Sequence, residues 1–234
     1  MASIRTGKTK DGTIPPIDAL LPGKTETATL ALGCFWGPDS LFGCTKGVVR
    51  TRVGYTGGTL KNPTYQNLGD HVETVQLDYD TDKTSFEKLL WIFWGGHTPQ
   101  DRAWKRQYMS AVFFRDEEQE KLAKEVKARV EERLKARLFT EVFPLSEFYM
   151  AEDYHQKYHL QGEPDFIDEF SLIYPNIKDL IASTAAARVN GYLGGYGTDE
   201  SLEAEIGGFG LSPEQANKLR DIVRGSKRYN PIWV

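Results

Sequence analysis

The stretch from residue 27 to 42 constrains the fold more than any other part of this 234-residue chain. Thr27 to Leu32 alternates small or polar residues with apolar ones, which predicts a strand. Gly33-Cys34-Phe35-Trp36-Gly37 follows, and then Pro38. Because proline is tolerated only in the first turn of a helix, a helix must open close to Pro38, with Cys34 at or just before its N-terminus. The sequence therefore predicts a strand, a turn that carries a cysteine, and a helix.

Cys34 is a candidate nucleophile because of this position. Unpaired backbone N–H groups and the positive end of the helix dipole gather at a helix N-terminus, and both favour a thiolate. Phe35 and Trp36 would place an apolar wall beside the sulfur. A buried cysteine that acts as a small hydrophobic residue is the commoner case in general. The flanking glycines and the helix start favour a reactive thiol here.

The sequence gives little support for metal binding or for a structural disulfide. Cys44 is the only other cysteine, and across the predicted helix the two Cα atoms would lie roughly 15 Å apart, against a disulfide limit of about 7 Å. His155 and His159 have i, i+4 spacing, but no glutamate follows the first of them as in the zinc proteases. We therefore expect no metal, and no cross-link while the helix is intact.

Glu73 is a second residue of interest. Val72 to Tyr79 alternates in polarity, which predicts a strand. One face of this strand is apolar, with Val75, Leu77 and Tyr79, and Glu73 falls on the same face. A carboxylate that points into a core costs several kcal/mol when ionised, unless it finds a partner or keeps its proton to a higher pH. The alternative is that Glu73 lies at the strand end and leans into water.

Strands and helices alternate through residues 26–160. The patterns predict further strands over Val48 to Tyr55, Ser110 to Phe114 and Thr140 to Leu145, and helices from a Thr84 cap to Gly95 and over Asp116 to Arg137. This alternation around one sheet predicts an α+β sandwich.

The composition differs on both sides of this core. Residues 1–25 are rich in glycine and proline, which predicts an irregular lead-in. Residues 161–234 show helical patterns, a break at Pro175, a glycine-rich turn over Asn190 to Gly197, and a last helix capped at Ser212. We therefore expect three parts: a lead-in (1–25), a catalytic α+β domain (26–160) and a helical C-terminal extension packed on the core (161–234).

Charge and hydropathy limit the partners. The formal net charge of -4 argues against nucleic acid and anionic membranes. No apolar run is long enough to span a bilayer, and Met1 to Lys24 lacks the apolar segment of a secretory signal. We expect a cytoplasmic monomer, with targeting to an organelle left open.

Several motifs occur in order along the chain: Gly33-Cys34-Phe35-Trp36-Gly37, Arg52-Val53-Gly54-Tyr55-Thr56-Gly57-Gly58, Asn62-Pro63-Thr64-Tyr65, His71-Val72-Glu73, Gln107-Tyr108 and Ala151-Glu152-Asp153-Tyr154-His155-Gln156. Together they resemble the A-type peptide methionine sulfoxide reductases, over roughly Thr27 to Tyr158. The resemblance implies a ferredoxin-like α+β core. It also implies a thiol-dependent enzyme that repairs oxidative damage by reducing the S-epimer of methionine sulfoxide, free or in proteins.

The resemblance further implies roles for the matching residues. The catalytic group would be Cys34, Glu73, Tyr65 and Tyr108, and the substrate-binding group would be Phe35, Trp36, Tyr154 and His155. Cys34 would attack the sulfoxide sulfur and become a sulfenic acid. Glu73 would protonate the oxygen, with hydrogen bonds from the two tyrosines. No cofactor is bound in such an enzyme, and an external thiol (thioredoxin, glutaredoxin or a small thiol) would reduce the sulfenic acid.

The chain departs from the family pattern at three positions. Aligned on Gln107-Tyr108, Ala103 and Met109 stand where many members have Asp and Arg. Leu193 stands in the run where several members carry a recycling cysteine. Cys44 is then the only internal candidate for recycling, and we expect an external thiol to attack Cys34 directly.

Two other functions remain open at this stage. A Cys-His hydrolase or acyl transferase would pair Cys34 with His155, and acyl-enzyme formation on esters would support it. A non-catalytic module would only bind oxidised methionine through the aromatic residues. Turnover of a sulfoxide peptide with dithiothreitol separates such a module from an enzyme.

Overall fold

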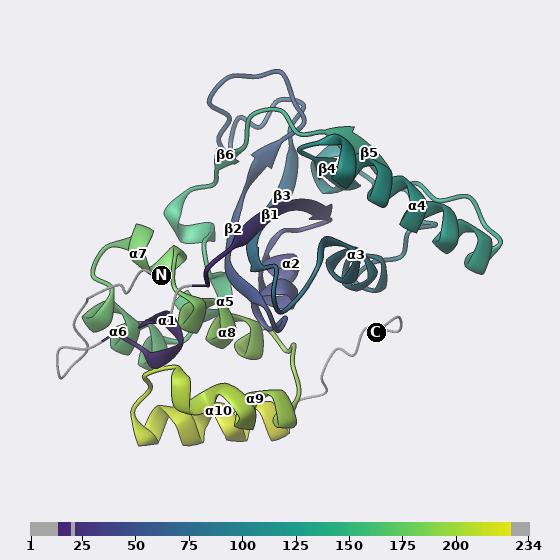
Figure 1. Cartoon of the computed structure of the whole chain (residues 1–234). Helices are drawn as coiled ribbons and strands as arrows, with labels where there is room; N and C mark the ends of the chain where they lie inside the picture. The colour runs from purple at the N-terminus through teal and green to yellow at the C-terminus, as the bar shows by residue number, and fades with distance from the viewer. Residues whose placement is uncertain (1–13, 20–21, 226–234) are drawn as a thin grey trace.

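A computed structural model describes residues 14–19 and 22–225. Within them, six strands form one sheet in the order β5-β4-β1-β3-β2-β6, with every neighbouring pair antiparallel except β4 and β5. The strands are β1 (Thr25–Leu32), β2 (Val48–Thr56), β3 (Val72–Asp80), β4 (Ser110–Phe114), β5 (Glu141–Pro144) and β6 (Tyr149–Met150). The α+β class predicted from the sequence is confirmed (Figure 1).

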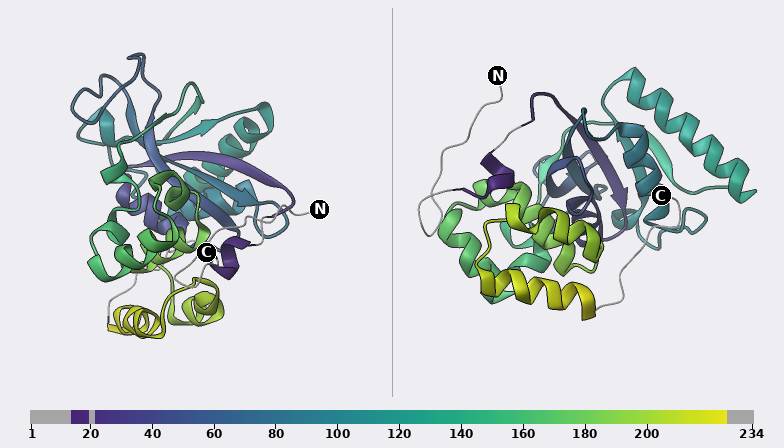
Figure 2. Two further views of the ribbon diagram at one scale, coloured as in Figure 1. Left: turned by 90° about the vertical axis from the view of Figure 1, so that its left-hand side faces the viewer. Right: turned by 60° about the horizontal axis from the view of Figure 1, so that its bottom comes forward.

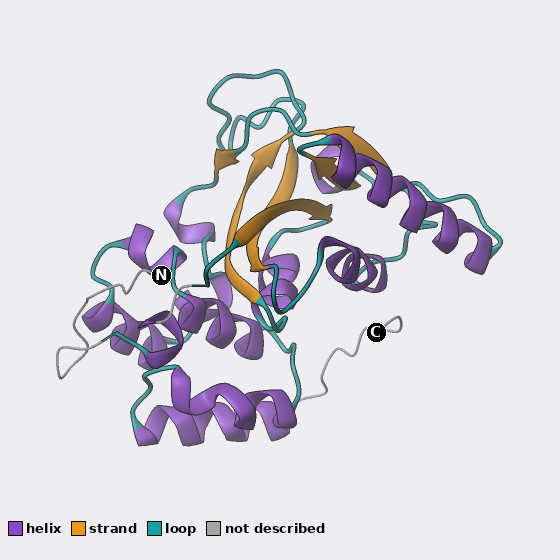
Figure 3. Cartoon of the chain, in the orientation of Figure 1, coloured by secondary structure: helices purple, strands orange, loops and turns teal. Residues whose placement is uncertain are grey.

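The helices fall into two groups. Helices α2 (Trp36–Gly43), α3 (Phe86–Gly95) and α4 (Glu117–Leu134) belong to the part of the chain that forms the sheet. The second group is α1 (Pro16–Ala19), α5 (Tyr158–Gln161), α6 (Pro164–Ile173), α7 (Ile177–Ile181), α8 (Thr184–Leu193), α9 (Asp199–Glu205) and α10 (Pro213–Gly225). Figures 2 and 3 show this second group gathered on the side of the sheet away from α3 and α4.

Each group has its own apolar core. In the first, residues of the central strands such as Val75 and Leu77 pack with Phe93 of α3 and Val126 of α4. This is the stripe that the steps of four in the α4 sequence create, since Val126 and Val130 are buried. The second core joins the C-terminal helices through side chains such as Phe166, Phe170, Val189, Leu202 and Leu219. Within the described ranges, no helix is both long enough and apolar enough to cross a membrane.

Several local expectations need correction. Ser85, and not Thr84, caps α3, because the Ser85 side chain accepts a hydrogen bond from the Lys88 N–H. Asn190 to Leu193 is not a turn but the last part of α8, and the chain turns only from Gly194 onward. Helix α4 ends at Leu134, because Lys135 adopts the left-handed conformation. Strand β6 lies in a segment for which no strand was expected, and α9 is a helix of the C-terminal extension that was not predicted individually.

The expected lead-in lies only partly within the described residues. Residues 1–13 and 20–21 lie outside them, and Pro16–Ala19 forms helix α1. Asp18 of this helix is buried and accepts hydrogen bonds from the Ser183 hydroxyl at 2.6 Å and the Thr184 N–H at 2.6 Å. The start of α8 is therefore tied to the N-terminal segment.

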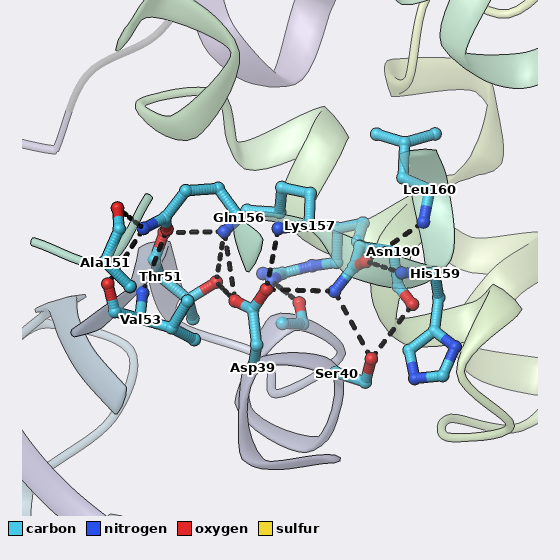
Figure 4. Close-up of polar contacts among 12 residues, drawn as sticks. Asp39, Ser40, Thr51, Val53, Ala151, Gln156, Lys157, His159, Leu160 and Asn190 are labelled. Atoms are coloured by element: carbon cyan, nitrogen blue, oxygen red, sulfur yellow. Dashed lines mark hydrogen bonds and ion pairs between the residues drawn. The ribbon is translucent and has the colours of Figure 1, made fainter. Parts of the chain in front are cut away.

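A buried polar network joins α2, β2 and α8 (Figure 4). Lys157 Nζ pairs with an Asp39 oxygen of α2 at 3.0 Å and donates to the Thr51 carbonyl of β2 at 2.7 Å. The Lys157 N–H and the Asn190 amide of α8 donate to the other Asp39 oxygen, at 3.1 and 3.3 Å. All four residues are buried. Because Lys157 directly follows the Ala151 to Gln156 motif, the network fixes that motif against the helix that begins beside Cys34.

Candidate active site

The cysteine turn lies where β1 meets α2. Gly33 has φ +86°, a conformation open mainly to glycine, and it lets the chain leave the strand at once. Phe35 is the N-cap residue of α2, so Cys34 lies just before the helix as expected, and it is exposed. No disulfide joins Cys34 and Cys44. The sulfur therefore lies at the N-terminus of a helix and is accessible to solvent.

The pKa of the Cys34 thiol differs from the sequence expectation. Desolvation by the walls of the site raises it, and the nearby Glu73 carboxylate raises it further. The backbone N–H of Trp36 acts in the expected direction and lowers it, but desolvation outweighs this contact. The thiol therefore holds its proton more firmly than an ordinary cysteine does.

Glu73 is buried beside this turn, so the alternative that it leans into water is wrong. Its side chain is only 1% exposed. One carboxylate oxygen accepts a hydrogen bond from the Phe35 N–H at 3.1 Å, and the other accepts one from the Gln107 side-chain amide at 2.7 Å. Burial raises the pKa of Glu73, although both hydrogen bonds act against the shift. A carboxyl group that keeps its proton to a higher pH than usual thus lies next to the cysteine.

His155 lies at the centre of an aromatic group. It is 2% exposed, and its ring contacts Phe35, Tyr65 and Tyr154, with centroids 5.0, 4.8 and 4.1 Å away. The Trp36 indole N–H donates to His155 Nδ1 at 3.2 Å. Since Nδ1 accepts this bond, the neutral ring carries its proton on Nε2. Burial lowers the pKa of His155, with the Glu152 carboxylate acting weakly against the shift, so the neutral form is favoured.

This arrangement bears on the hydrolase alternative. A Cys-His pair needs an imidazole nitrogen that accepts the thiol proton. Here Nδ1 already accepts from Trp36, and Nε2 is buried 4.0 Å from a Glu152 oxygen. The imidazole is therefore placed to orient the Trp36 indole, not to activate Cys34.

Trp36 is held on a second side by Tyr158. The two rings stack at 3.7 Å with an interplanar angle of 6°. Tyr158 is 40% exposed and Tyr154 is 54% exposed, so both rings reach the surface at the edge of the site. Phe35 is buried, so Trp36 forms the part of the aromatic wall that faces the solvent side.

Tyr65 and Tyr108 complete the group of expected residues. A hydrogen bond links their hydroxyl groups, and desolvation together with this bond raises the pKa of Tyr108 to about 12. The Tyr108 phenol is therefore protonated near neutral pH and can donate a hydrogen bond. Glu152 positions the Tyr65 loop, because its carboxylate accepts from the Tyr65 N–H and the Tyr55 hydroxyl, each at 2.8 Å.

Sequence reasoning gave no role to three residues of this site. Gln107 and Glu152 were noted only as parts of motifs, and Tyr158 was not singled out. Their partners Glu73, Tyr65 and Trp36 are far away in the sequence, so spacing carries no signal for these contacts. Cys44 lies elsewhere, at the C-terminal end of α2, where its Sγ is 3.8 Å from the Arg188 carbonyl. Among the residues described, His, Cys, Asp and Glu form no group of three that could hold a metal ion.

The chain is similar to known proteins over most of its length. The family model described as peptide methionine sulfoxide reductase matches residues 26–183, and a model for the helical domain of selenoprotein methionine sulfoxide reductase A matches residues 176–224. A peptide methionine sulfoxide reductase of Drosophila melanogaster is 44% identical over 195 residues, which cover 81% of this chain and 76% of that protein. The A5 protein of Oryza sativa subsp. japonica is 38% identical over 72% of this chain and 68% of its own length.

Solved structures are also similar to this chain. Methionine sulfoxide reductase A of Corynebacterium diphtheriae superposes with a TM-score of 0.57 at 30% identity, over 70% of this chain and 88% of that one. Reduced Mxr1 of Saccharomyces cerevisiae superposes with a TM-score of 0.56 at 26% identity, over 62% of this chain and 88% of its own.

Proposed function

Because the chain belongs to the peptide methionine sulfoxide reductase family, and therefore reduces methionine sulfoxide, we propose that Cys34 is its nucleophile and Glu73 its general acid. The observation that carries this assignment is the buried Glu73 carboxyl group with a raised pKa, hydrogen-bonded to the Phe35 N–H beside Cys34. An acid that keeps its proton near neutral pH is what a departing sulfoxide oxygen needs.

The first half of the reaction moves one oxygen atom. Cys34, after losing its proton, attacks the substrate sulfur, and Glu73 protonates the sulfoxide oxygen. The hydroxyl group then passes from the substrate sulfur to the Cys34 sulfur, as the substrate sulfur–oxygen bond and the transient bond between the two sulfurs break. Methionine is released, and Cys34 is left as a sulfenic acid. Methionine sulfoxide is reduced by two electrons to methionine, and Cys34 is oxidised by two. Tyr65 and Tyr108 donate hydrogen bonds to the oxygen while it gains charge.

The aromatic residues bind the substrate. Phe35 and Trp36 surround the methyl group of methionine sulfoxide, and His155 and Tyr154 line the same pocket. The hydrogen bond from Trp36 to His155 and the stacking on Tyr158 support this role, because they hold the indole in one orientation. We assign the S-epimer as substrate, which is the epimer reduced by the A-type enzymes.

An external thiol completes the cycle. Two thiols reduce the sulfenic acid to Cys34, with release of water and formation of one disulfide. Cys44 is separated from Cys34 by the whole of α2 and lies against α8, so direct attack by thioredoxin, glutaredoxin or a small thiol is the simpler route. We propose that the enzyme works as a cytoplasmic monomer in the repair of oxidised methionine.

Replacement of the nucleophile tests the proposal. We expect Cys34→Ser to form no methionine in a single turnover with a sulfoxide peptide, while it keeps its circular dichroism spectrum. Cys44→Ser is the matched control and should form one equivalent. Methionine formed by Cys34→Ser would overturn the assignment. Failure of the parent to turn over with dithiothreitol would favour a module that only binds oxidised methionine.

The recycling route has its own test. Because helix α2 separates the two cysteines, we expect Cys44→Ser to keep most of its steady-state activity with a small thiol. Substrate turnover without reductant should leave a sulfenic acid that dimedone traps at Cys34, as seen by mass spectrometry. A Cys34 to Cys44 disulfide in the peptide map, with loss of thioredoxin-driven turnover in Cys44→Ser, would contradict this route.

A further inference from the structure

An exposed tryptophan lies next to the active site. Trp104 is 75% exposed, the largest fraction among the exposed large hydrophobic residues of the described chain. Its ring packs against Tyr108, with centroids 5.4 Å apart, and Lys105 Nζ lies 4.6 Å from its centroid. An indole with this exposure contributes little to the core, and tryptophan is enriched where proteins bind their partners.

The same loop concentrates positive charge. Arg102, Lys105 and Arg106 lie within five residues, and Asp101 is the one carboxylate beside them in the sequence. Within the described residues none of the three cations takes part in an ion pair with a carboxylate. Arg106 instead donates to the carbonyls of Asp70 at 2.7 Å and Gly57 at 3.0 Å.

Arg102 and Lys105 both rest on aromatic rings. The Arg102 guanidinium lies 4.4 Å from the Phe139 centroid, and Lys105 lies over Trp104. In a chain with a net charge of -4, this loop is a local positive patch, and no ion pair with a carboxylate among the described residues offsets its charges. A negatively charged partner is therefore the complementary one.

The loop is continuous with the active site. Residues Arg106–Tyr108 form a short 3₁₀ helix, in which Gln107 donates to Glu73 and Tyr108 contacts Tyr65. Trp104 is thus in direct ring contact with Tyr108, a residue of the site. An extended polypeptide advances about 3.3 Å per residue, so a chain whose methionine sulfoxide is at Cys34 reaches Trp104 within a few residues.

We propose that Arg102, Trp104 and Lys105 form a second subsite of the enzyme, which binds acidic residues flanking methionine sulfoxide in a polypeptide substrate. This inference rests on the proposed function of the Cys34 site. The carboxylates of the substrate pair with Lys105 and Arg102, and its backbone and apolar groups lie on the Trp104 ring. Substrates that carry acidic flanks are preferred over those with basic flanks, and a substrate with no flanking residues does not use the subsite.

Three substrates test the proposal: two short peptides with methionine sulfoxide between aspartates or between lysines, and N-acetyl methionine sulfoxide amide. With dithiothreitol as reductant, the parent should show a kcat/KM about three- to tenfold higher for the aspartate peptide than for the lysine peptide, as expected for exposed ion pairs. This preference should shrink as salt rises from about 0.05 to 0.5 M.

Charge reversal supplies the variants. Arg102→Glu with Lys105→Glu should reverse the order of the two peptides and leave the blocked amino acid unchanged. Lys88→Glu is the control for an exposed lysine, because it lies in α3, which begins beyond the far end of β3. Trp104→Ala should lower kcat/KM for both peptides by a similar factor, whereas Trp104→Tyr should restore most of it.

The outcomes separate the subsite from the chemistry. Equal kcat/KM for the two peptides in the parent, or an equal loss on all three substrates in the charge-reversal variant, would overturn the subsite. If the parent does not reduce even the blocked amino acid, the proposed function of the Cys34 site fails instead. Unchanged melting temperatures across the variants confirm that only the surface was altered.

Discussion

At the scale of single residues, the active site contains a buried carboxyl group whose ionisation is unfavourable. Glu73 is buried with its pKa raised, so its ionised form is disfavoured in the folded protein. A carboxyl group with a raised pKa stabilises the fold only below its ordinary pKa, and this contribution is lost as the pH rises through the folded-state value. The proposed general acid therefore lowers the stability of the folded protein at neutral and alkaline pH.

Glu73→Gln tests both consequences. The amide keeps the shape and cannot ionise, so we expect a melting temperature above that of the parent at pH 8 and close to it at pH 4. Turnover should fall by about 10²- to 10⁴-fold, because the proton donor is lost. Calorimetry from pH 4 to 8 and single-turnover kinetics measure the two effects.

Glu152→Gln provides a control with the opposite sign. Although burial raises it, hydrogen bonds from the Tyr65 N–H and the Tyr55 hydroxyl bring the pKa of Glu152 below its ordinary value. Its ionised form therefore stabilises the fold above the ordinary pKa. The amide should destabilise at pH 8 and much less at pH 4. The same trend in both variants would contradict the assigned environments.

The sequence was sufficient to single out Cys34 and Glu73 as candidate site residues. It was not sufficient to predict their protonation states. The strand alternation places Glu73 on the apolar face, and Pro38 places Cys34 at a helix start. The pKa of Cys34 depends on desolvation by residues from several segments, which no local pattern reveals. For the same reason the function of Gln107, which reaches Glu73 from 34 positions away, was not predicted.

At the scale of elements, a buried ion pair between Asp39 and Lys157 fixes the position of α2. Lys157 is fully buried against Asp39, and burial lowers the pKa of Lys157 while Asp39 acts against this shift. Lys157 also has φ 51°, a strained conformation that the surrounding contacts must maintain. The pair fixes α2, β2 and the segment that carries His155 in one arrangement.

A double-mutant cycle measures this pair. Asp39→Asn leaves the Lys157 charge buried without its counter-ion, and Lys157→Met leaves the Asp39 charge, so each should cost about 3 to 5 kcal/mol. The double variant should cost clearly less than the sum of the two, because neither buried charge remains. Urea unfolding gives the free energies. Strictly additive losses would show that the two charges do not interact.

Element prediction succeeded where one local rule decides the structure. Ser110 to Phe114 and the capped helix after Ser212 were predicted with their observed starts. The turn expected at Asn190 was wrong because tertiary contacts override the low helix propensity of glycine. Gly191 lies in α8 where a Cβ would collide with Cys44 and the Ser40 carbonyl, so glycine there allows close helix packing, not a turn.

At the scale of the whole molecule, the C-terminal helices support the catalytic part through Arg188. This residue of α8 is 3% exposed. Its guanidinium donates to the Gly43 carbonyl at the end of α2 and to the Val48 carbonyl at the start of β2, and it pairs with Glu205 at 2.9 Å. The division at residue 160 remains a prediction, and α5 (Tyr158–Gln161) spans that position.

Arg188→Met measures how far the two parts depend on each other. Loss of the guanidinium leaves two buried carbonyls without their donor, and we expect a cost of about 2 to 4 kcal/mol in the free energy of unfolding. Lys218→Met is the control, because its ion pair with Asp165 lies on the surface and should be worth less than about 1 kcal/mol. Similar costs for the two variants would contradict a supporting role for Arg188.

The separation of the two cysteines by α2 has a consequence under peroxide. The Cys34 sulfenic acid that we propose would have no neighbouring cysteine to capture it, so a second oxidation to the sulfinic acid would compete directly with the arriving thiol. The sulfinic acid is a dead end for this cycle. The fraction of enzyme lost to over-oxidation would then depend on the ratio of thiol to oxidant around it.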